Sequence, residues 1–160
     1  MTEPKRIWWA RPRKLCALER PGGGGRSHRP ERREAEIAHL KEKGIRLVVS
    51  TMKSRHNLEA YDDAGLDWHH VPVASCREGE EALEELLAFL RRDLKAAGAV
   101  AIHGNRHTDF VAAVAAAHVH QHRGIAPADG LRAAAEAGLN VTEDAARLLG
   151  VDPAEIQPRS

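Results

Sequence analysis

Three short apolar runs, each followed by a segment with helical character, constrain this chain of 160 residues more than any other feature. The runs cover residues 45–50, 66–73 and 99–103, and they are rich in branched aliphatic side chains, as buried strands are. Strands that alternate with helices of about ten residues or more form parallel or mixed sheets with helices on both faces. We therefore predict an α/β fold of three layers, with a central, mostly parallel sheet of about four to five strands and helices on both faces.

The expected helices are delimited by capping residues, prolines and glycines. Ser75 and Glu78 have the spacing of a capping box, which predicts a long helix reaching about Ala97. Thr108 is the predicted N-cap of the next helix, and Thr142 caps the last short one. The other helices are expected over residues 31–43, within 55–65, and from Pro127 to Ala137. These boundaries leave a polar turn between the last strand and the helix that starts at Thr108.

The polar turn Gly104–His107 occupies the most favourable place for a ligand in this arrangement. Right-handed crossovers bring the loops after the three strands to one edge of the sheet, where open α/β folds bind ligands. The turn leads into the N-terminus of a helix, where free amides and the helix dipole attract anions. We therefore predict an anion-binding site formed by Gly104, Asn105, Arg106, His107 and Thr108.

Composition limits the classes of protein to which this chain can belong. A length of 160 residues with 42% hydrophobic residues suits one globular domain. No apolar run approaches the roughly 18–20 residues of a membrane helix, and the first residues lack the apolar core of a signal peptide. Cys16 and Cys76 lack metal-binding spacing and are expected to be reduced thiols. We expect a cytoplasmic protein without a membrane partner.

Charge is distributed unevenly along the chain. Residues 1–33 contain ten Lys or Arg and three acidic residues, a charge of +7, and the remainder of the chain carries −6. Near the N-terminus, Trp8 and Trp9 are expected to hold a strand against the domain, and the glycines from Gly22 to Gly25 predict a mobile basic loop that extends to Arg29. The expected segments are a basic N-terminal segment packed on the same domain (1–33), the main domain (34–150) and a C-terminal tail (151–160).

Four stretches resemble the cysteine-dependent protein tyrosine and dual-specificity phosphatases. They are WARPRKLCALERPG, LKEKGIRLVVST, GLDWHHVPV and AIHGNRHTDFVAAVAAAH, and the resemblance runs from Trp8 to about Ala137. In that family a strand ends in H-C-x-x-G-x-x-R-S/T, whose loop holds a phosphate. The cysteine attacks phosphorus, the arginine binds the equatorial oxygens, and an aspartate on the preceding loop protonates the leaving group. The resemblance implies a phosphatase-like domain with its site at the turn after the last strand.

The turn departs from the family pattern at each of these groups. His103 matches the family's histidine and Thr108 its hydroxyl residue, but they are five positions apart instead of eight, and no cysteine lies between them. His107 stands where the arginine belongs, and Arg106 is one place early. The loop that should carry the general acid, PVASCREGEE, holds no aspartate. We predict a pseudophosphatase without cysteine-dependent activity, whose 103–109 loop binds an anionic or phosphorylated small molecule or a phosphoprotein.

Alternatives remain open for the chemistry at this edge. His103 and His107 could act as acid and base, oriented by Asp109, on an anionic or phosphate-bearing small molecule. The same three residues could hold a divalent metal, although no cofactor is expected. Cys76 could replace the missing nucleophile, and it completes the candidate catalytic residues. As a third function, the basic N-terminal segment could bind a protein partner or, least expected, nucleic acid.

Overall fold

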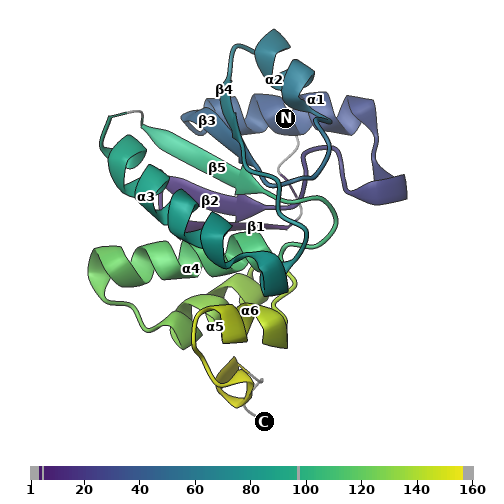
Figure 1. The fold of residues 1–160 in the computed structure, drawn as a ribbon. Coiled ribbons are helices and arrows are strands. Elements are labelled where there is room, and N and C mark those ends of the chain that lie inside the picture. Colours follow the sequence, from purple (N-terminus) through teal and green to yellow (C-terminus); the bar gives the residue numbers. More distant parts are fainter. Residues whose placement is uncertain (1–3, 5, 97, 157–160) are drawn as a thin grey trace.

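A five-stranded sheet lies at the centre of the structure, a computed structural model that describes residues 4, 6–96 and 98–156 (Figure 1). The strands are β1 (Ile7–Arg11), β2 (Leu15–Leu18), β3 (Ile45–Ser50), β4 (Asp67–His70) and β5 (Ala99–His103). Their order in the sheet is β1-β2-β5-β3-β4. β1 pairs antiparallel with β2, and the other three pairings are parallel. The sheet is therefore mostly parallel, as the alternation of apolar runs and helices predicted.

Helices cover both faces of the sheet (Figure 1). One face carries α1 (Pro30–Glu42) and α2 (Leu58–Asp63), and the other carries α3 (Glu80–Ala96) and α4 (Asp109–Arg123). Two further helices, α5 (Pro127–Glu136) and α6 (Glu143–Leu148), pack against α4. Three short 3-10 turns complete the elements: η1 (Gly25–Ser27), η2 (Cys76–Glu78) and η3 (Pro153–Ile156). The predicted three-layer α/β fold is confirmed. None of the described helices is long and apolar enough to cross a membrane.

The alternation of side chains along the strands divides the core into two parts. Leu15 and Ala17 of β2 face α3 and α4, whereas Cys16 and Leu18 face α1 and α2. Between the sheet and α5, α4 is buried at every position of 110–119, and most of these residues are alanine or valine. Because these side chains are small, the backbone of α4 can lie close to both neighbours.

The two adjacent tryptophans fix the N-terminal strand to the domain, as predicted. Trp8 pairs with Ala17 and Trp9 with Cys16 across the antiparallel ladder, so their rings project from opposite faces of the sheet. Trp8 packs into the core beside α4 and α5, and Trp9 packs into the core beside α1 and α2. β1 is consequently an integral edge strand of the sheet.

The start of α3 differs from the sequence-based prediction, because the capping box is not formed. Ser75 is extended, with φ −165°, and its side chain makes no capping hydrogen bond. Its carbonyl instead accepts a hydrogen bond from the Glu78 amide at 3.2 Å, which produces the turn η2. α3 begins at Glu80, two residues after Glu78 and directly after Gly79. A Cβ at Gly79 would lie 2.6 Å from the ring of Phe110, so the glycine allows α4 to approach this turn. Residue 97, near which the helix was expected to end, lies outside the described residues.

Two other boundaries illustrate where local rules succeed and fail. β4 ends at His70, although the sequence predicted a strand over 66–73; beyond it the amides of Val71 and Val73 still donate to the carbonyls of Ser50 and Thr51, at 2.9 and 3.1 Å. The N-cap of α6 is confirmed, since the Thr142 hydroxyl accepts a hydrogen bond from the Ala145 amide at 3.2 Å.

Candidate functional site

The turn 104–107 lies at the carboxyl edge of the sheet, between the end of β5 and the start of α4. It forms one wall of a cleft of about 500 Å³. The other walls come from residues 51–54, which follow β3, and residues 73–75, which lie beyond β4. Three loops that follow parallel strands therefore meet at one cleft, and this is the place where open α/β sheets bind ligands.

Backbone amides of the turn are available to a ligand. The amides of residues 105–108 have no hydrogen-bond acceptor within the part of the chain that the structure describes. Residues 105–107 are exposed, and the positive end of the α4 dipole lies beside them. Asp109 opposes this charge, because its carboxylate also lines the cleft and its Oδ1 accepts a hydrogen bond from the Phe110 amide at 2.9 Å. The turn can thus donate hydrogen bonds to an anion placed on the side away from Asp109.

Thr108 takes the N-cap position of α4, but its side chain does not cap the helix as predicted. The hydroxyl is fully buried, and its oxygen accepts a hydrogen bond from the Asn140 amide at 2.7 Å. A second contact lies beside it, where the Thr142 hydroxyl donates to Asp109 Oδ2 at 2.9 Å. The loop between α5 and α6 therefore holds the start of α4, and Thr108 is fully buried and does not line the cleft.

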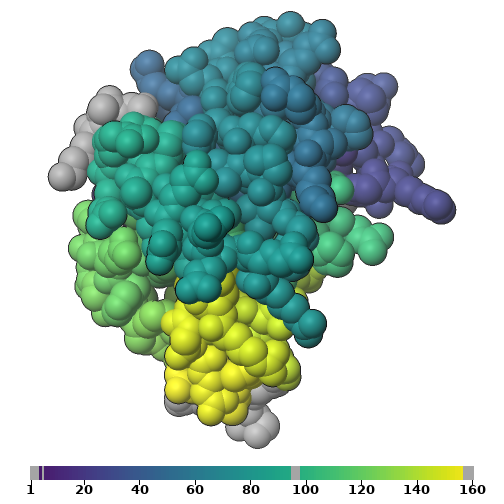
Figure 2. Space-filling view, viewed as in Figure 1, coloured from purple at the N-terminus to yellow at the C-terminus, as the bar shows by residue number. Residues whose placement is uncertain are grey.

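The glycine-rich segment is packed against the turn, whereas the sequence predicted a mobile loop. Residues 21–24 are buried, and a Cβ at Gly24 would lie 2.5 Å from the Arg106 amide nitrogen. The Gly25 amide donates to Asn105 Oδ1 at 3.0 Å, and the Arg20 amide donates to the Asn105 carbonyl at 3.3 Å. In the space-filling view, purple atoms of the N-terminal segment lie beside green atoms at the right margin (Figure 2). Only a residue without a side chain fits at Gly24, so the glycine run supports the shape of the turn.

His103 is fully buried at the end of β5 and is hydrogen-bonded at both ring nitrogens. Its Nδ1 lies 2.8 Å from the Gly104 carbonyl, which can only accept, so Nδ1 carries the proton. The Nε2 atom therefore accepts a hydrogen bond from the Tyr61 hydroxyl at 2.7 Å. Burial lowers the pKa of His103 to about 4, so the ring is neutral at pH 7. His103 supports the turn from beneath and does not face the cleft.

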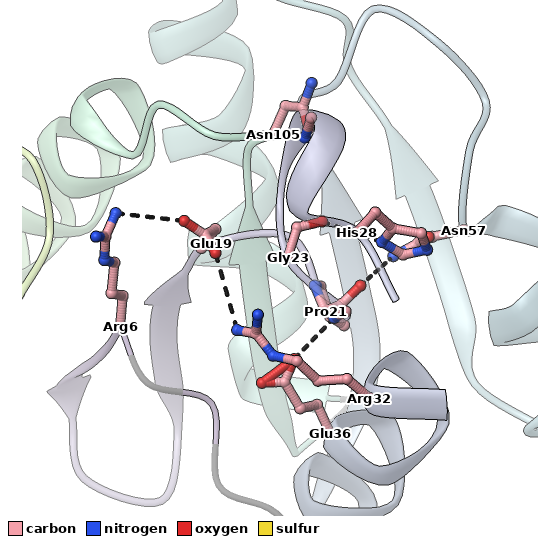
Figure 3. Close-up of polar contacts among 11 residues, drawn as sticks. Arg6, Glu19, Pro21, Gly23, His28, Arg32, Glu36, Asn57 and Asn105 are labelled. Carbon is pink, nitrogen blue, oxygen red and sulfur yellow. Dashed lines mark hydrogen bonds and ion pairs between the residues drawn. The ribbon is translucent and has the colours of Figure 1, made fainter. Parts of the chain in front are cut away.

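A chain of buried polar groups extends from His103 to the N-terminal segment. The Tyr61 hydroxyl accepts a hydrogen bond from Asn57 Nδ2 at 3.3 Å. The same amide group donates to the Pro21 carbonyl at 3.0 Å (Figure 3). Asn57 Oδ1 accepts from Arg20 Nε at 3.1 Å. Arg20 is only 8% exposed, and it forms no ion pair with a described carboxylate. This chain joins α2, the glycine-rich segment and the end of β5 into one unit.

Cys76 lies in η2, near the start of α4. Its thiol is buried and faces the carboxylate of Asp109. Burial, followed by the charge of Asp109, raises the pKa of this thiol. A protonated, buried thiol is a poor nucleophile, so the geometry does not favour Cys76 as a replacement for the family's catalytic cysteine.

The residues proposed for acid–base or metal chemistry are not brought together. His107 is exposed on the turn, whereas His103 is buried below it with both nitrogens occupied. Asp109 is engaged by Phe110 and Thr142. Over the described ranges, no three His, Cys, Asp or Glu side chains are placed to hold a metal ion. The geometry therefore offers no acid–base pair and no metal set at His103, His107 and Asp109.

Positive charge at the cleft comes from two side chains in different loops. Lys53 and Arg106 both line the cleft and are exposed, and neither forms an ion pair with a described residue. Lys53 follows β3, a position that no motif in the sequence indicated. An anion between them would be held by two flexible cations in addition to the amides.

Part of the charge of the basic N-terminal segment is neutralised within the fold. Arg6 and Arg32 lie on either side of Glu19, with N···O distances of 3.4 and 3.9 Å (Figure 3). Arg32 also pairs at 3.2 Å with Glu36, which is 1% exposed and accepts a hydrogen bond from the Gly22 amide at 2.7 Å. These pairs reduce the free positive charge that nucleic acid would require.

The roles of four residues in this region are not predicted from the sequence. Arg20, Asn57 and Tyr61 form the buried support of the turn, and Lys53 adds a charge to the cleft. Arg20 was counted only as part of the charge of residues 1–33. One signal was present for Asn57, which precedes the helix α2 in the left-handed conformation at φ 75°, a conformation that asparagine tolerates.

The fold is similar to that of solved dual-specificity and tyrosine phosphatases. Human DUSP28 superposes with a TM-score of 0.69 over 93% of this chain and 95% of that chain, at 19% identity. TpbA of P. aeruginosa, in a cysteine-to-serine variant solved in complex with pTyr, gives a TM-score of 0.72 over 98% and 91%, at 17% identity. At these identities the likeness shows the fold. No family model and no curated protein matches the sequence.

Proposed function

We propose that this protein is a degenerate relative of the cysteine-dependent phosphatases, which binds an anionic or phosphorylated ligand in the cleft above the turn and does not hydrolyse phosphate esters through a thiol. The observation that carries the proposal is the row of exposed residues 105–107, whose amides have no acceptor among the described residues and lie at the N-terminus of α4. A helix N-terminus with free amides is a common binding site for phosphate and carboxylate.

Two further observations support a phosphorylated ligand. Arg106 and Lys53 supply charge from two walls of the same cleft, so an anion between them would be bound from several directions. The phosphatase-like structure of TpbA was solved with pTyr, so a protein of this fold accepts a phosphorylated ligand. A volume of about 500 Å³ is sufficient for a phosphorylated side chain or a small phosphate ester.

The absence of a thiol from the turn supports the proposal that the protein does not hydrolyse phosphate esters through a thiol. Residues 103–109 contain no cysteine, and the nearest candidate, Cys76, is buried beside the carboxylate of Asp109. In-line attack on phosphorus requires an ionised and accessible nucleophile. Ser75 is exposed and lines the cleft, but no described histidine or carboxylate is hydrogen-bonded to its hydroxyl to activate it.

The test is a titration of the full chain with inorganic phosphate and with O-phosphotyrosine, followed by the amide chemical shifts. We expect saturable shifts at residues 104–109 and a loss of affinity of about tenfold in the variant Arg106→Gln, which corresponds to about 1.4 kcal/mol. Arg46→Gln is the matched control, because Arg46 is also exposed but lies at the start of β3, at the opposite edge of the sheet. Equal affinity in both variants, or no shift in the turn, would contradict the binding site.

Hydrolysis is tested separately with p-nitrophenyl phosphate. We expect no turnover above the rate in buffer, and no change on replacing Cys76 with serine. Turnover that disappears in Cys76→Ser would overturn the proposal that thiol chemistry is absent, while leaving the anion site in place.

A further inference from the structure

A second cleft lies far from the turn, between α3 and α4. Its volume is about 240 Å³. Leu90 and Leu94 of α3 form one wall, His118 and His122 of α4 form the other, and Arg11 enters from the end of β1. The ladder places Arg11 opposite Leu15, level with the start of β5, whereas the turn 104–107 follows the end of β5. The two clefts therefore lie at opposite edges of the sheet.

The second cleft gathers positive charge without a carboxylate. Arg11 and Arg91 line it, and no acidic side chain does. Burial, followed by the charge of Arg123, lowers the pKa of Arg11, which places a third guanidinium nearby. None of these three arginines forms an ion pair with a residue in the described ranges. The C-terminal dipole of α4 offsets part of the charge at Arg123, but Arg11 and Arg91 come from other elements.

His118 has an unmet hydrogen-bonding requirement in this cleft. Its Nε2 lies 3.2 Å from Arg11 Nη1, and a guanidinium can only donate, so Nε2 accepts and Nδ1 carries the proton. Nδ1 is buried and has no acceptor among the described residues. The residue is only 3% exposed, and its ring stacks on that of His122 with a centroid distance of 5.9 Å. A buried N–H donor without an acceptor is costly, and an anion nearby would remove part of that cost.

We propose that the cleft between α3 and α4 binds a small organic anion, whose carboxylate or phosphate head is held by Arg11 and Arg91 and whose short apolar part lies on Leu94. The apolar wall favours an organic anion over a bare inorganic one. The volume lies below the range of about 300–1,000 Å³ that holds drug-sized ligands, so only a few non-hydrogen atoms fit. Gln121 also lines the cleft and can donate from its amide.

The experiment is a titration of the full chain with three sodium salts at constant ionic strength: hexanoate, butyl phosphate and chloride. The readouts are the amide shifts of α3 and α4 and the ring signals of His118. Saturation by hexanoate or butyl phosphate identifies the head group. Burial, followed by the charges of Arg11 and His122, lowers the pKa of His118 to about 4, and binding should raise it because an anion stabilises the imidazolium.

Variants separate this site from the cleft above the turn. We expect Arg11→Gln and Arg91→Gln each to weaken binding at α3 and α4 by about tenfold or more, with Arg46→Gln as the matched control. Arg91 is exposed, so Arg91→Gln keeps the test valid if Arg11→Gln does not fold. Shifts that are the same for all three salts, or binding that persists in both variants, would overturn the proposal. Shifts at residues 104–109 are measured in the same spectra, so failure of one site is distinguishable from failure of the other.

Discussion

Acidification should destabilise this protein through His103. In the unfolded chain, this histidine takes up a proton near its ordinary pKa of 6.5. In the folded protein, burial lowers the pKa of His103 to about 4. Because the folded pKa is the lower one, the stabilisation is present above pH 6.5 and is lost as the pH falls towards 4. Between pH 7.5 and pH 5.0 the difference in proton binding lowers the free energy of unfolding by about 2 kcal/mol.

The assay is urea denaturation followed by tryptophan fluorescence at both pH values, combined with the ring signals of His103 in the folded state. Near pH 5 we expect a slope of about 1 kcal/mol per pH unit from this residue, with the free energy of unfolding rising with pH. His118 contributes in the same direction, since burial and then Arg11 lower its pKa to about 4. The variant His118→Gln should therefore keep the part of the pH dependence of the free energy of unfolding that comes from His103, and lose the part that comes from His118.

Two results would refute this reasoning. One is a free energy of unfolding that is equal or higher at pH 5.0. The other is a folded-state His103 ring that titrates near 6.5, because the hydrogen bonds from Tyr61 and to Gly104 would then fail to keep the ring neutral.

Three further perturbations examine the support of the turn. Tyr61→Phe keeps the ring but leaves His103 Nε2 buried without a donor, and should lower the free energy of unfolding by about 1–3 kcal/mol in urea denaturation; a loss below about 0.5 kcal/mol would contradict the hydrogen-bonded chain. Gly24→Ala should cost about 1–3 kcal/mol, because the added methyl would lie 2.5 Å from the Arg106 amide nitrogen although φ at Gly24 is an ordinary −89°; shifts in the turn identical to wild type would disprove the overlap. Cys76 should resist alkylation by iodoacetamide at pH 8 in the native protein and react in urea, as followed by mass spectrometry, and rapid native labelling would show an accessible thiolate.

The fold could be predicted from the sequence because its signals are local and repeated. The runs 45–50 and 99–103 become β3 and β5 with the same bounds, since branched aliphatic residues between glycine and polar residues are typical of buried strands. The Thr142 cap was predicted for a similar reason, as both partners of its hydrogen bond lie within one helical turn.

The supports of the site could not be predicted, because they join residues distant in the chain. The Tyr61–His103 hydrogen bond spans 42 positions, and that from Arg20 to Asn57 spans 37. Thr108 has the residue type and position of a helix cap, yet its hydroxyl is taken by the Asn140 amide, 32 positions away. Local propensity describes what a residue can do, and tertiary contacts decide which of its partners it receives.

The contact between Gly24 and Arg106 has a consequence for how such a protein can change over evolutionary time. A turn with the three additional residues of an active phosphatase loop would need the space in which the glycines now lie. The long loop and the four consecutive glycines should therefore exclude each other among homologues. A gain of the longer loop in one lineage should therefore be accompanied by a changed segment at 22–25 that no longer fills this space, so the two segments should change together.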